Sequence, residues 1–465
     1  MSTTPDALDP PYAVVEAALA ASRTLGCVAI VEEKSEAEVR FANNTTTTNG
    51  VRLSRRVTII SLAKVEGGVS AGVASRAGSV DVKELVRTAE SLALSTGATK
   101  DAFDLVIGGA SRDFERAPGL TDLSVLSDVL DDLSGAFTRA QKAETTLAGF
   151  AEHSVLSTYL GTSSGIRRRH VKPTGSFQMV GRRDGGSRSA WTAMASTDFS
   201  DVKVTSIEEQ LFQRLDWAQK SIDLDAGRYE VILPPSAVAD LMSSVYNAAV
   251  GKEAEDGKSV FSGPNGGTKI GERLCDLPFE LRSDPSEAPL ECEDFLVAGS
   301  SDARVSVFDN GVALERTKWI TDGTLNQLQY PRANAERSGV NFAGPIDNLT
   351  LELPGAGAKL ADLVATTECG LLLTSLWYIR TVDPMTLLLT GLTRDGVYLI
   401  EDGQVKGAVN NFRFNESPVD LLARVSEAGQ TERTRGRESG DWKNRTAMPA
   451  LRIPDFNMSS VSPAN

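Results

Sequence analysis

Five residues, Gly161-Thr-Ser-Ser-Gly165, have the G-x-S-x-G spacing of a serine nucleophile motif. The two histidines of the chain, His153 and His170, lie on either side of them. The motif activates its serine only on a strained turn between a strand and a helix, above a parallel sheet. Here the following residues, Ile166 to Val180, have a strand-like pattern, and no parallel-sheet pattern surrounds them. We therefore predict a hairpin loop around Ser163 rather than a serine hydrolase site.

A glycine-rich stretch, Gly263-Pro-Asn-Gly-Gly-Thr-Lys269, has some likeness to a phosphate-binding loop. That loop needs glycine directly before the lysine and serine or threonine directly after it, so that backbone amides and lysine converge on the phosphates. In this chain Thr268 precedes Lys269 and Ile270 follows it. The phosphate-binding motif is therefore absent.

Side chains that could bind a metal ion are few. A catalytic zinc ion takes three protein ligands from His, Glu, Asp or Cys. The only histidines, His153 and His170, are 17 residues apart, and no C-x-x-C pair is found. We interpret the other candidates as buried thiols or solvated loop carboxylates; they are Cys275, Cys292, Glu253, Glu255 and Asp256. The residues alone thus predict no catalytic, cofactor-binding or metal site.

The chain of 465 residues is acidic, with 48 Lys plus Arg against 62 Asp plus Glu and a formal charge of −14. An acidic surface repels phosphate backbones, so we do not expect nucleic acid as a partner. Two basic runs stand out, Arg167 to His170 and the alternating Arg433, Arg435 and Arg437. We interpret them as a solvated strand end and a polar loop.

The sequence carries no recognisable export or membrane signal. Residues Met1 to Pro11 are polar, include three prolines and lack the basic and apolar regions of a signal peptide. No run approaches 18 apolar residues, the length of a membrane-spanning helix. Cys27, Cys275, Cys292 and Cys369 are scattered, which favours reduced thiols and a cytoplasmic location.

The first half of the chain has helices separated by groups of strands. Helices are expected at Tyr12 to Leu25, Asp81 to Ser95, Leu123 to Thr146 and Ser206 to Ser221. Strands are expected at Cys27 to Glu32, Ala37 to Asn43, Val51 to Leu62, Val69 to Ser75, Gly149 to Leu160, Ile166 to Val180 and Ser187 to Ala195. This order predicts an α+β fold with helices packed on antiparallel strands. We place an N-terminal α+β domain at 1–110 and a middle helix-plus-antiparallel-strand domain at 111–226.

A C-terminal domain is predicted at 227–465, built on an antiparallel β meander with flanking helices. It opens on a strand, Tyr229 to Leu233, and Pro234-Pro-Ser236 begins a helix that runs to about Val250. Gly429 to Lys443 is interpreted as a mobile charged segment, followed by a closing strand around Leu451 to Phe456.

The meander is predicted between Cys369 and Phe414. Its expected strands are Leu371 to Thr381, Leu387 to Leu392, Gly396 to Glu401 and Gln404 to Val409. Asp383-Pro384 lies at the first turn and Asp402-Gly403 at the last. Asp-Gly between two strands is a strong hairpin signal, because a type I′ turn needs positive φ at both central residues.

Several spread-out patterns resemble the TldD/PmbA family, also described as modulators of DNA gyrase. They are RFANNTTTTNG (Arg40 to Gly50), SVFSG (Ser259 to Gly263), SGVNFAGPIDNLTLE (Ser338 to Glu352) and the meander. The resemblance covers nearly the whole chain and contains no short catalytic signature. It implies one of two subunit types. The TldD type binds zinc through a HExxxH helix whose glutamate is a general base, and the TldE/PmbA type lacks that motif.

This chain resembles the second type. With SVFSG as a landmark, the histidines of HExxxH would fall near Met242 and Asn247 and the glutamate at Ser243. The resemblance therefore implies a non-catalytic TldE/PmbA-like subunit of a heterodimeric metallopeptidase that processes or degrades small unfolded peptides. Zinc is expected in the TldD-type partner and not in this chain, so whether the chain is itself an enzyme stays open.

Two alternatives remain beside this expectation. The chain could be a stand-alone peptide-binding or regulatory homodimer without a peptidase partner. It could also be a self-sufficient hydrolase that uses Ser163 or Cys369, in which case it would cleave peptides in the presence of a chelator.

Overall fold

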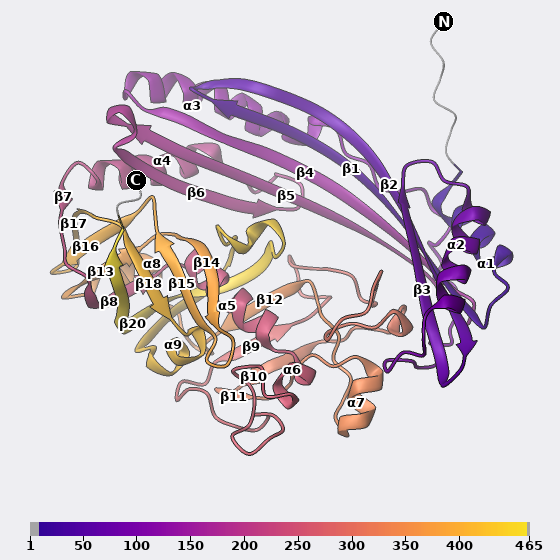
Figure 1. Cartoon of the computed structure of the whole chain (residues 1–465). Helices are drawn as coiled ribbons and strands as arrows, with labels where there is room; N and C mark the ends of the chain where they lie inside the picture. Colours follow the sequence, from indigo (N-terminus) through magenta and orange to yellow (C-terminus); the bar gives the residue numbers. More distant parts are fainter. Residues whose placement is uncertain (1–8, 463–465) are drawn as a thin grey trace, which may run out of the picture.

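The computed structural model describes residues 9–462. Most of the stretch Met1 to Pro11, predicted to be polar and not a signal peptide, lies outside these residues. The chain forms two layers: a long curved sheet that arches over a C-terminal body (Figure 1). Among the described residues, none of the helices has both the length and the apolar character needed to cross a lipid bilayer.

The arch is a six-stranded antiparallel sheet with the strand order β3-β2-β1-β4-β5-β6. Its strands are β1 (Gly26–Ala42), β2 (Thr45–Val65), β3 (Gly68–Ala77), β4 (Thr146–Thr162), β5 (Arg167–Arg183) and β6 (Arg188–Ser196). The predicted boundary at 110/111 falls between β3 and β4 of this one sheet, and the three domain limits stay predictions.

Two predicted strands, Cys27 to Glu32 and Ala37 to Asn43, are in fact the single strand β1, so the predicted break was wrong. The polar residues between them are cross-strand partners, because Glu33 binds Arg55 and Glu36 binds Arg52, both on β2. Carboxylates that pair with a neighbouring strand continue a sheet and do not interrupt it.

Four helices cover the arch. α3 (Ser127–Lys142) and α4 (Val204–Trp217) pack on one face of it, and α1 (Pro11–Ala21) and α2 (Val82–Ser95) lie at its other end. Asp81 caps α2 by accepting the backbone N–H of Glu84 at 3.0 Å, so the helix begins one residue after its predicted start. The predicted helix Leu123 to Thr146 is shorter: it begins with the 3-10 turn η1 (Leu123–Leu126) and ends at Lys142, and Thr146 already belongs to β4.

The C-terminal body contains a 14-stranded sheet flanked by short helices. Its helices are α5 (Pro235–Ala248), α6 (Gly251–Glu255), α7 (Arg332–Ser338), α8 (Leu360–Ala365) and α9 (Pro418–Arg424). Its strands are β7 (Ser221–Ile222), β8 (Gly227–Leu233), β9 (Glu280–Ser283), β10 (Thr317–Thr321), β11 (Thr324–Leu325), β12 (Asn348–Glu352), β13 (Cys369–Leu373), β14 (Leu376–Asp383), β15 (Leu388–Thr393), β16 (Val397–Glu401), β17 (Gln404–Val409), β18 (Phe412–Glu416), β19 (Glu427–Thr434) and β20 (Arg445–Val461).

The predicted Asp402-Gly403 hairpin is confirmed. Glu401 pairs with Gln404, and the two turn residues have φ of 51° and 72°. The predicted strand Leu371 to Thr381 is wrong, because it is two strands, β13 and β14, with different neighbours. β13 pairs antiparallel with β16 and parallel with β8, which lies outside the segment, and β14 pairs antiparallel with β15. The segment is therefore a branched antiparallel structure rather than a simple meander.

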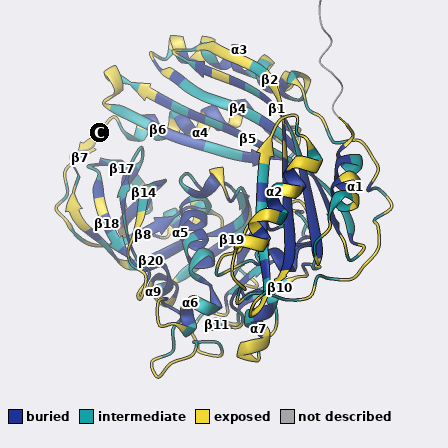
Figure 2. Ribbon diagram, turned by 45° about the vertical axis from the view of Figure 1, so that its right-hand side comes forward, coloured by how far each residue is buried: buried dark blue, intermediate teal, exposed yellow. Residues whose placement is uncertain are grey.

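The segment Gly429 to Lys443 was predicted to be a mobile charged loop, and this prediction was wrong. Its first half is part of β19, which pairs with β20. Its second half contains Arg435, Ser439 and Lys443, which are 2%, 1% and 5% exposed. Its charges are thus held between the arch and the body, where Figure 2 colours much of the chain as buried.

Candidate functional site

Helix α5 lies in the body, next to the boundary between the two layers (Figure 1). Pro234 and Pro235 begin it, with Pro235 at the first helical position, where a missing N–H costs nothing. Val238, Leu241 and Val245 pack into the main core of the C-terminal body. Other side chains of the helix are polar, and they define the candidate site.

Asp240 on α5 is 2% exposed and holds the turn that follows β19. Its carboxylate accepts the backbone N–H groups of Arg437 (3.1 Å), Glu438 (3.1 Å) and Ser439 (2.8 Å), and also the Ser439 hydroxyl (2.7 Å). Burial raises the pKa of Asp240 to about 6, although these hydrogen bonds oppose the shift. One buried side chain thus satisfies four donors of a distant segment.

The turn held by Asp240 positions Arg437 at the boundary between the layers. Arg437 forms an ion pair with Asp395. Its guanidinium lies 5.3 Å from the ring centroid of Trp191, on β6 of the arch, and 4.9 Å from that of Trp377, on β14 of the body. A guanidinium between two indoles is stabilised by cation–π attraction, so Arg437 links the two layers.

Tyr246, two turns further along α5, orders a second buried cluster. Its hydroxyl donates to the carbonyl of Ile346 (2.9 Å) and accepts the N–H of Ile346 (2.7 Å). Lys443 lies 4.2 Å from the Tyr246 ring centroid, and its Nζ donates to the same carbonyl at 2.9 Å. Burial lowers the pKa of Lys443 to about 8, against the attraction of Asp347.

Asp347 and its cations connect this cluster to the arch. Asp347 pairs with Lys172 of β5 at 3.0 Å and lies 3.9 Å from Arg445. Arg445 also donates to the Pro173 carbonyl (2.6 Å) and to the Thr174 hydroxyl (3.0 Å). Burial alone would raise the pKa of Asp347, but the nearby cations outweigh it and lower the pKa. We call Lys172, Asp347, Lys443 and Arg445 the inter-layer cluster.

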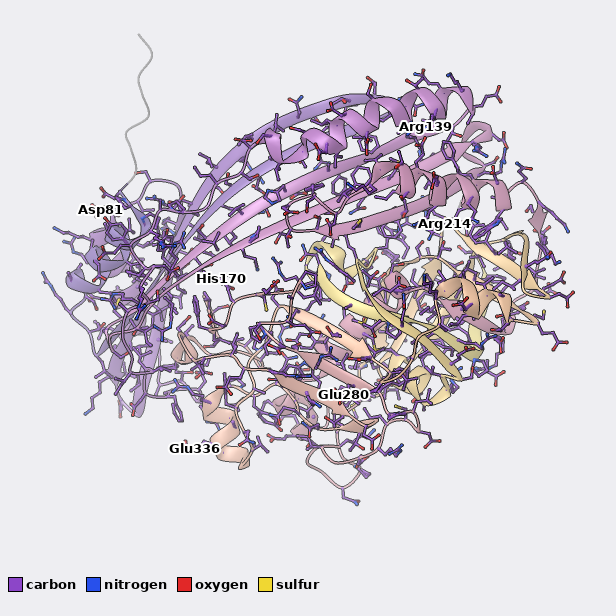
Figure 3. All side chains as sticks on the ribbon, turned by 180° about the vertical axis from the view of Figure 1, so that it is seen from behind. Asp81, Arg139, His170, Arg214, Glu280 and Glu336 are labelled. Atoms are coloured by element: carbon purple, nitrogen blue, oxygen red, sulfur yellow. The ribbon has the colours of Figure 1, made fainter. Side chains whose placement is uncertain are left out.

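The predicted histidine candidates lie on the arch and do not come together. His153 Nδ1 lies 2.6 Å from the Thr121 hydroxyl and its Nε2 lies 2.8 Å from the Thr197 carbonyl, on the helix-covered face. His170 lies opposite Thr158, five residues further along β4, and Figure 3 shows it beneath the arch. Five residues of strand span about 16 Å, so the two imidazoles cannot share one metal ion.

The positions where the resemblance places zinc ligands do not fit a zinc ion. Met242 and Ser243 are 2% and 0% exposed, inside the body, and the Ser243 hydroxyl has no hydrogen-bond partner. Asn247 offers an amide, which is not a usual zinc ligand. Within residues 9–462, no three His, Cys, Asp or Glu side chains are grouped so as to hold a metal ion.

The other candidates have ordinary structural surroundings. Ser163 lies in the turn between β4 and β5, as the predicted hairpin requires, and its hydroxyl accepts the N–H of Cys27 at 3.0 Å. His153 is ten residues from Ser163 along the strand, about 33 Å, and His170 lies opposite Thr158, five residues or about 16 Å away. Neither histidine therefore pairs with Ser163. Cys369 is exposed at the start of β13.

The predicted buried thiols are confirmed, because Cys275 and Cys292 are 4% and 3% exposed and free. The loop position predicted for Glu253 and Glu255 was wrong, because both lie on helix α6. Glu255 accepts the Tyr330 hydroxyl at 2.9 Å, and Asp256, directly after the helix, pairs with Lys252. The basic run at 433–437 was predicted to be a polar loop. Arg433 instead lies in β19 and pairs with Asp201 at 2.9 Å, and Arg435 is buried.

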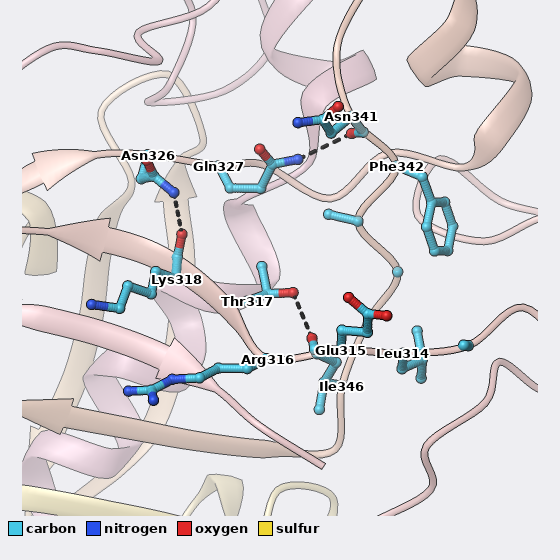
Figure 4. A pocket seen from close by; sticks show the side chains of 13 residues that line it. Leu314, Glu315, Arg316, Thr317, Lys318, Asn326, Gln327, Asn341, Phe342 and Ile346 are labelled. Atoms are coloured by element: carbon cyan, nitrogen blue, oxygen red, sulfur yellow. Dashed lines mark hydrogen bonds between the residues drawn. The ribbon is translucent and has the colours of Figure 1, made fainter. Parts of the chain in front are cut away.

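A groove of about 360 Å³ lies beside β10, on the segments that lead to Ile346 (Figure 4). Its sides are the stretches 313–318 and 341–346, with Asn326 and Gln327 between them. Asn326 donates to the Lys318 carbonyl (2.9 Å) and Gln327 donates to the Asn341 carbonyl (3.1 Å). The lining mixes charged side chains (Glu315, Arg316 and Lys318) with amide and apolar ones. The volume of the groove is within the size range of small-ligand sites.

Sequence reasoning missed Asp240, Tyr246, Asp347, Lys172 and the buried cations as members of one site. One signal was available: Asp240 is the only charged residue of the apolar helix α5. A carboxylate there needs a buried partner. The partner is a backbone turn about 200 residues away, which no local pattern identifies.

The fold and the site together define an α+β protein in which an arched sheet is clamped onto a mainly β body by buried polar contacts around one helix. Residues 226–460, just over half of the chain, match the family model "PmbA/TldA metallopeptidase C-terminal domain". The chain belongs to this PmbA/TldD family, as the resemblance implied. No curated protein matches it.

Solved structures with the same fold cover nearly the whole chain. TldE from Thermococcus kodakarensis is 17% identical with a TM-score of 0.77, over 96% of this chain and 98% of that one. A candidate modulator of a DNA gyrase from Thermotoga maritima is 16% identical with a TM-score of 0.73, over 93% and 95%. Another from Bacteroides thetaiotaomicron is 15% identical with a TM-score of 0.73, over 97% and 98%.

Proposed function

We propose that this protein is the non-catalytic, TldE-like subunit of a heterodimeric metallopeptidase that processes or degrades small unfolded peptides. Its partner is a TldD-type subunit, which supplies a HExxxH helix and the zinc ion. The free thiols of all four cysteines agree with a cytoplasmic site of action.

This proposal rests on which residues helix α5 carries at the positions of the zinc motif. At the positions of the zinc motif it has Met242, Ser243 and Asn247, of which the first two are packed in the core. The polar groups of the helix serve another purpose, because Asp240 and Tyr246 hold segments of their own chain. In this subunit the helix fixes the two layers relative to one another and leaves the hydrolytic chemistry to the partner.

The groove beside β10 supports a role in binding the peptide. Its amide and charged side chains (Figure 4) offer hydrogen-bond donors and acceptors to an extended peptide segment. The substrates of the proposed peptidase would enter as such extended segments.

Co-expression with a HExxxH-bearing relative tests the proposal. We expect a one-to-one complex with one zinc ion, peptide cleavage that a chelator abolishes, and loss of cleavage when the glutamate of the partner's motif becomes glutamine. In this chain, Ser163→Ala and Cys369→Ala should leave cleavage unchanged. Stoichiometric zinc in the isolated chain, or peptide cleavage by it in the presence of chelator, would overturn the proposal.

A further inference from the structure

A cavity of about 300 Å³ lies between the arch and the C-terminal body, beside the first turn of helix α5. The arch contributes residues of β6 and α4 to its lining. The body contributes the first turn of α5, Leu360 of α8, Leu372 of β13 and residues 432–434 at the end of β19. The volume is at the lower end of the range for small-ligand sites. We call this space the α4–α5 cavity; it shares no residue with the groove beside β10.

Arg214 of α4 lines the α4–α5 cavity and has no carboxylate partner. Figure 3 shows it at the boundary between the two layers. Within residues 9–462 it forms no ion pair, and its one hydrogen bond runs from Nη1 to the Trp191 carbonyl at 2.5 Å. Burial lowers the pKa of Arg214, and among the described residues only the Tyr398 phenol acts against this shift. A guanidinium has five N–H donors, so most donors of Arg214 have no acceptor within the described chain.

Arg433 of β19 is a second guanidinium in the lining with an unused donor. Its Nη1 pairs with Asp201 at 2.9 Å. Its Nε is buried and has no hydrogen-bond partner among the described residues. A buried donor without an acceptor costs free energy, which a bound acceptor would recover. The one carboxylate of the lining, Glu432, is exposed and accepts the Gln430 amide at 2.8 Å.

The first turn of α5 adds positive potential to the same cavity. Pro234, Pro235 and Ser236 belong to its lining. The N–H of Ser236, at the second helical position, has no acceptor inside the helix. The aligned peptide dipoles of this 14-residue helix place partial positive charge at its N-terminus. Three separate elements, α4, β19 and α5, thus present unused donors or positive charge to one space.

The other walls of the cavity are apolar. They are formed by the indoles of Trp191 and Trp217, the rings of Pro234 and Pro235, and the side chains of Leu360 and Leu372. A small inorganic anion would leave these walls uncovered. Apolar walls beside two guanidinium groups fit a ligand that has an anionic group at one end and an apolar body.

We propose that the α4–α5 cavity binds a small organic carboxylate, whose oxygens accept N–H groups of Arg214 and Arg433 and whose apolar body lies against the two indoles. The planar guanidinium matches a carboxylate through two parallel hydrogen bonds. The proposal is independent of the function proposed above, because the cavity lies within this chain and needs neither a zinc ion nor a partner subunit.

Titration calorimetry of the full chain with phenylacetate tests the proposal. We expect saturable binding with a Kd at or below about 1 mM. Two matched probes separate the contributions of charge and apolar body. Phenylacetamide keeps the ring and loses the charge, and acetate keeps the charge and loses the ring, so each should bind at least tenfold more weakly. These comparisons use the wild-type chain and do not depend on the folding of any variant.

Arg214→Gln should weaken phenylacetate binding at least tenfold, because it removes the unpaired guanidinium. Arg188→Gln is the matched control. Arg188 also donates to a carbonyl of α4, that of Leu215 at 3.3 Å, but it does not line the cavity, so its loss should leave the Kd unchanged. Indole fluorescence gives a second measurement, because two indoles line the cavity. Phenylacetate should change the emission, and Trp217→Phe should reduce that change.

Three results would overturn the proposal. The first is the absence of saturable phenylacetate binding up to about 10 mM, a range that covers weak ligands. The second is binding of phenylacetamide or of inorganic phosphate as tight as that of phenylacetate, since the site would then not select an organic carboxylate. The third is an unchanged Kd for phenylacetate in Arg214→Gln.

Discussion

The Asp240 carboxylate accepts the backbone N–H of Ser439 at 2.8 Å, although 199 residues of chain separate the two. This contact ties helix α5 to the turn that carries Arg437, and Arg437 in turn lies against indoles of both layers. A single buried acceptor thereby sets how the arch sits on the C-terminal body.

Gly436→Ala should weaken this contact more than any other one-methyl change nearby. A Cβ at position 436 would lie 2.3 Å from both Asp240 Oδ1 and Ser439 Oγ, so the turn must move away from its acceptor. We expect a loss of about 2 kcal/mol in unfolding free energy, measured by urea titration. Gly97→Ala, where a Cβ meets nothing within 4 Å, is the control. Equal stability of the two variants would contradict the role assigned to the turn.

Asp240 should make stability depend on pH in the acid range. The pKa of Asp240 is about 6 in the folded chain against 3.8 in the unfolded chain. Between these two pH values the folded state therefore keeps a proton on Asp240 that the unfolded state has lost. The contribution of Asp240 to stability therefore falls as pH rises from about 4 to 6, by up to about 3 kcal/mol, and is constant above. The difference in unfolding free energy between wild type and Asp240→Asn should therefore change with pH across this window. A constant difference would show that burial does not raise the pKa.

Asp347→Asn should destabilise the protein by removing the only carboxylate among the four residues of the inter-layer cluster. Lys172, Lys443 and Arg445 would then repel one another without compensation. We expect a loss of about 2 kcal/mol, below the range for a fully buried pair because a third of the Asp347 side chain stays exposed. Adding Lys443→Met should restore part of the stability, because it removes a buried cation. Thermal melts of the single and double variants test this, and a double variant less stable than Asp347→Asn would refute it.

His153 should make the protein less stable below neutral pH. Burial lowers the pKa of His153 in the folded state below the ordinary value of 6.5. Just below pH 6.5 the unfolded state therefore binds a proton at His153 more readily than the folded state does. The contribution of His153 is therefore present above pH 6.5 and lost as pH falls below it. Melting temperatures between pH 7.5 and 5 should fall less steeply for His153→Gln than for wild type. Parallel curves for the two proteins would mean that folding does not lower the pKa of His153.

Local patterns in the sequence determined much of the secondary structure. The hairpin at Asp402-Gly403 follows from the positive φ that both residues accept. The start of α2 follows from the Asp81 cap. The family followed from spread-out motifs, and the domain match at 226–460 confirms it.

Tertiary structure alone decided the rest. The run Leu371 to Thr381 looked like one strand, but its two halves join different neighbours, because strand pairing depends on residues far away in the chain. The segment that ends at Lys443 looked like a solvated loop because its charges are dense. It is buried because Asp240, Asp347 and the backbone of Ile346 supply partners from other parts of the chain. Composition tells which charges need compensation, and only the folded chain supplies the groups that compensate them.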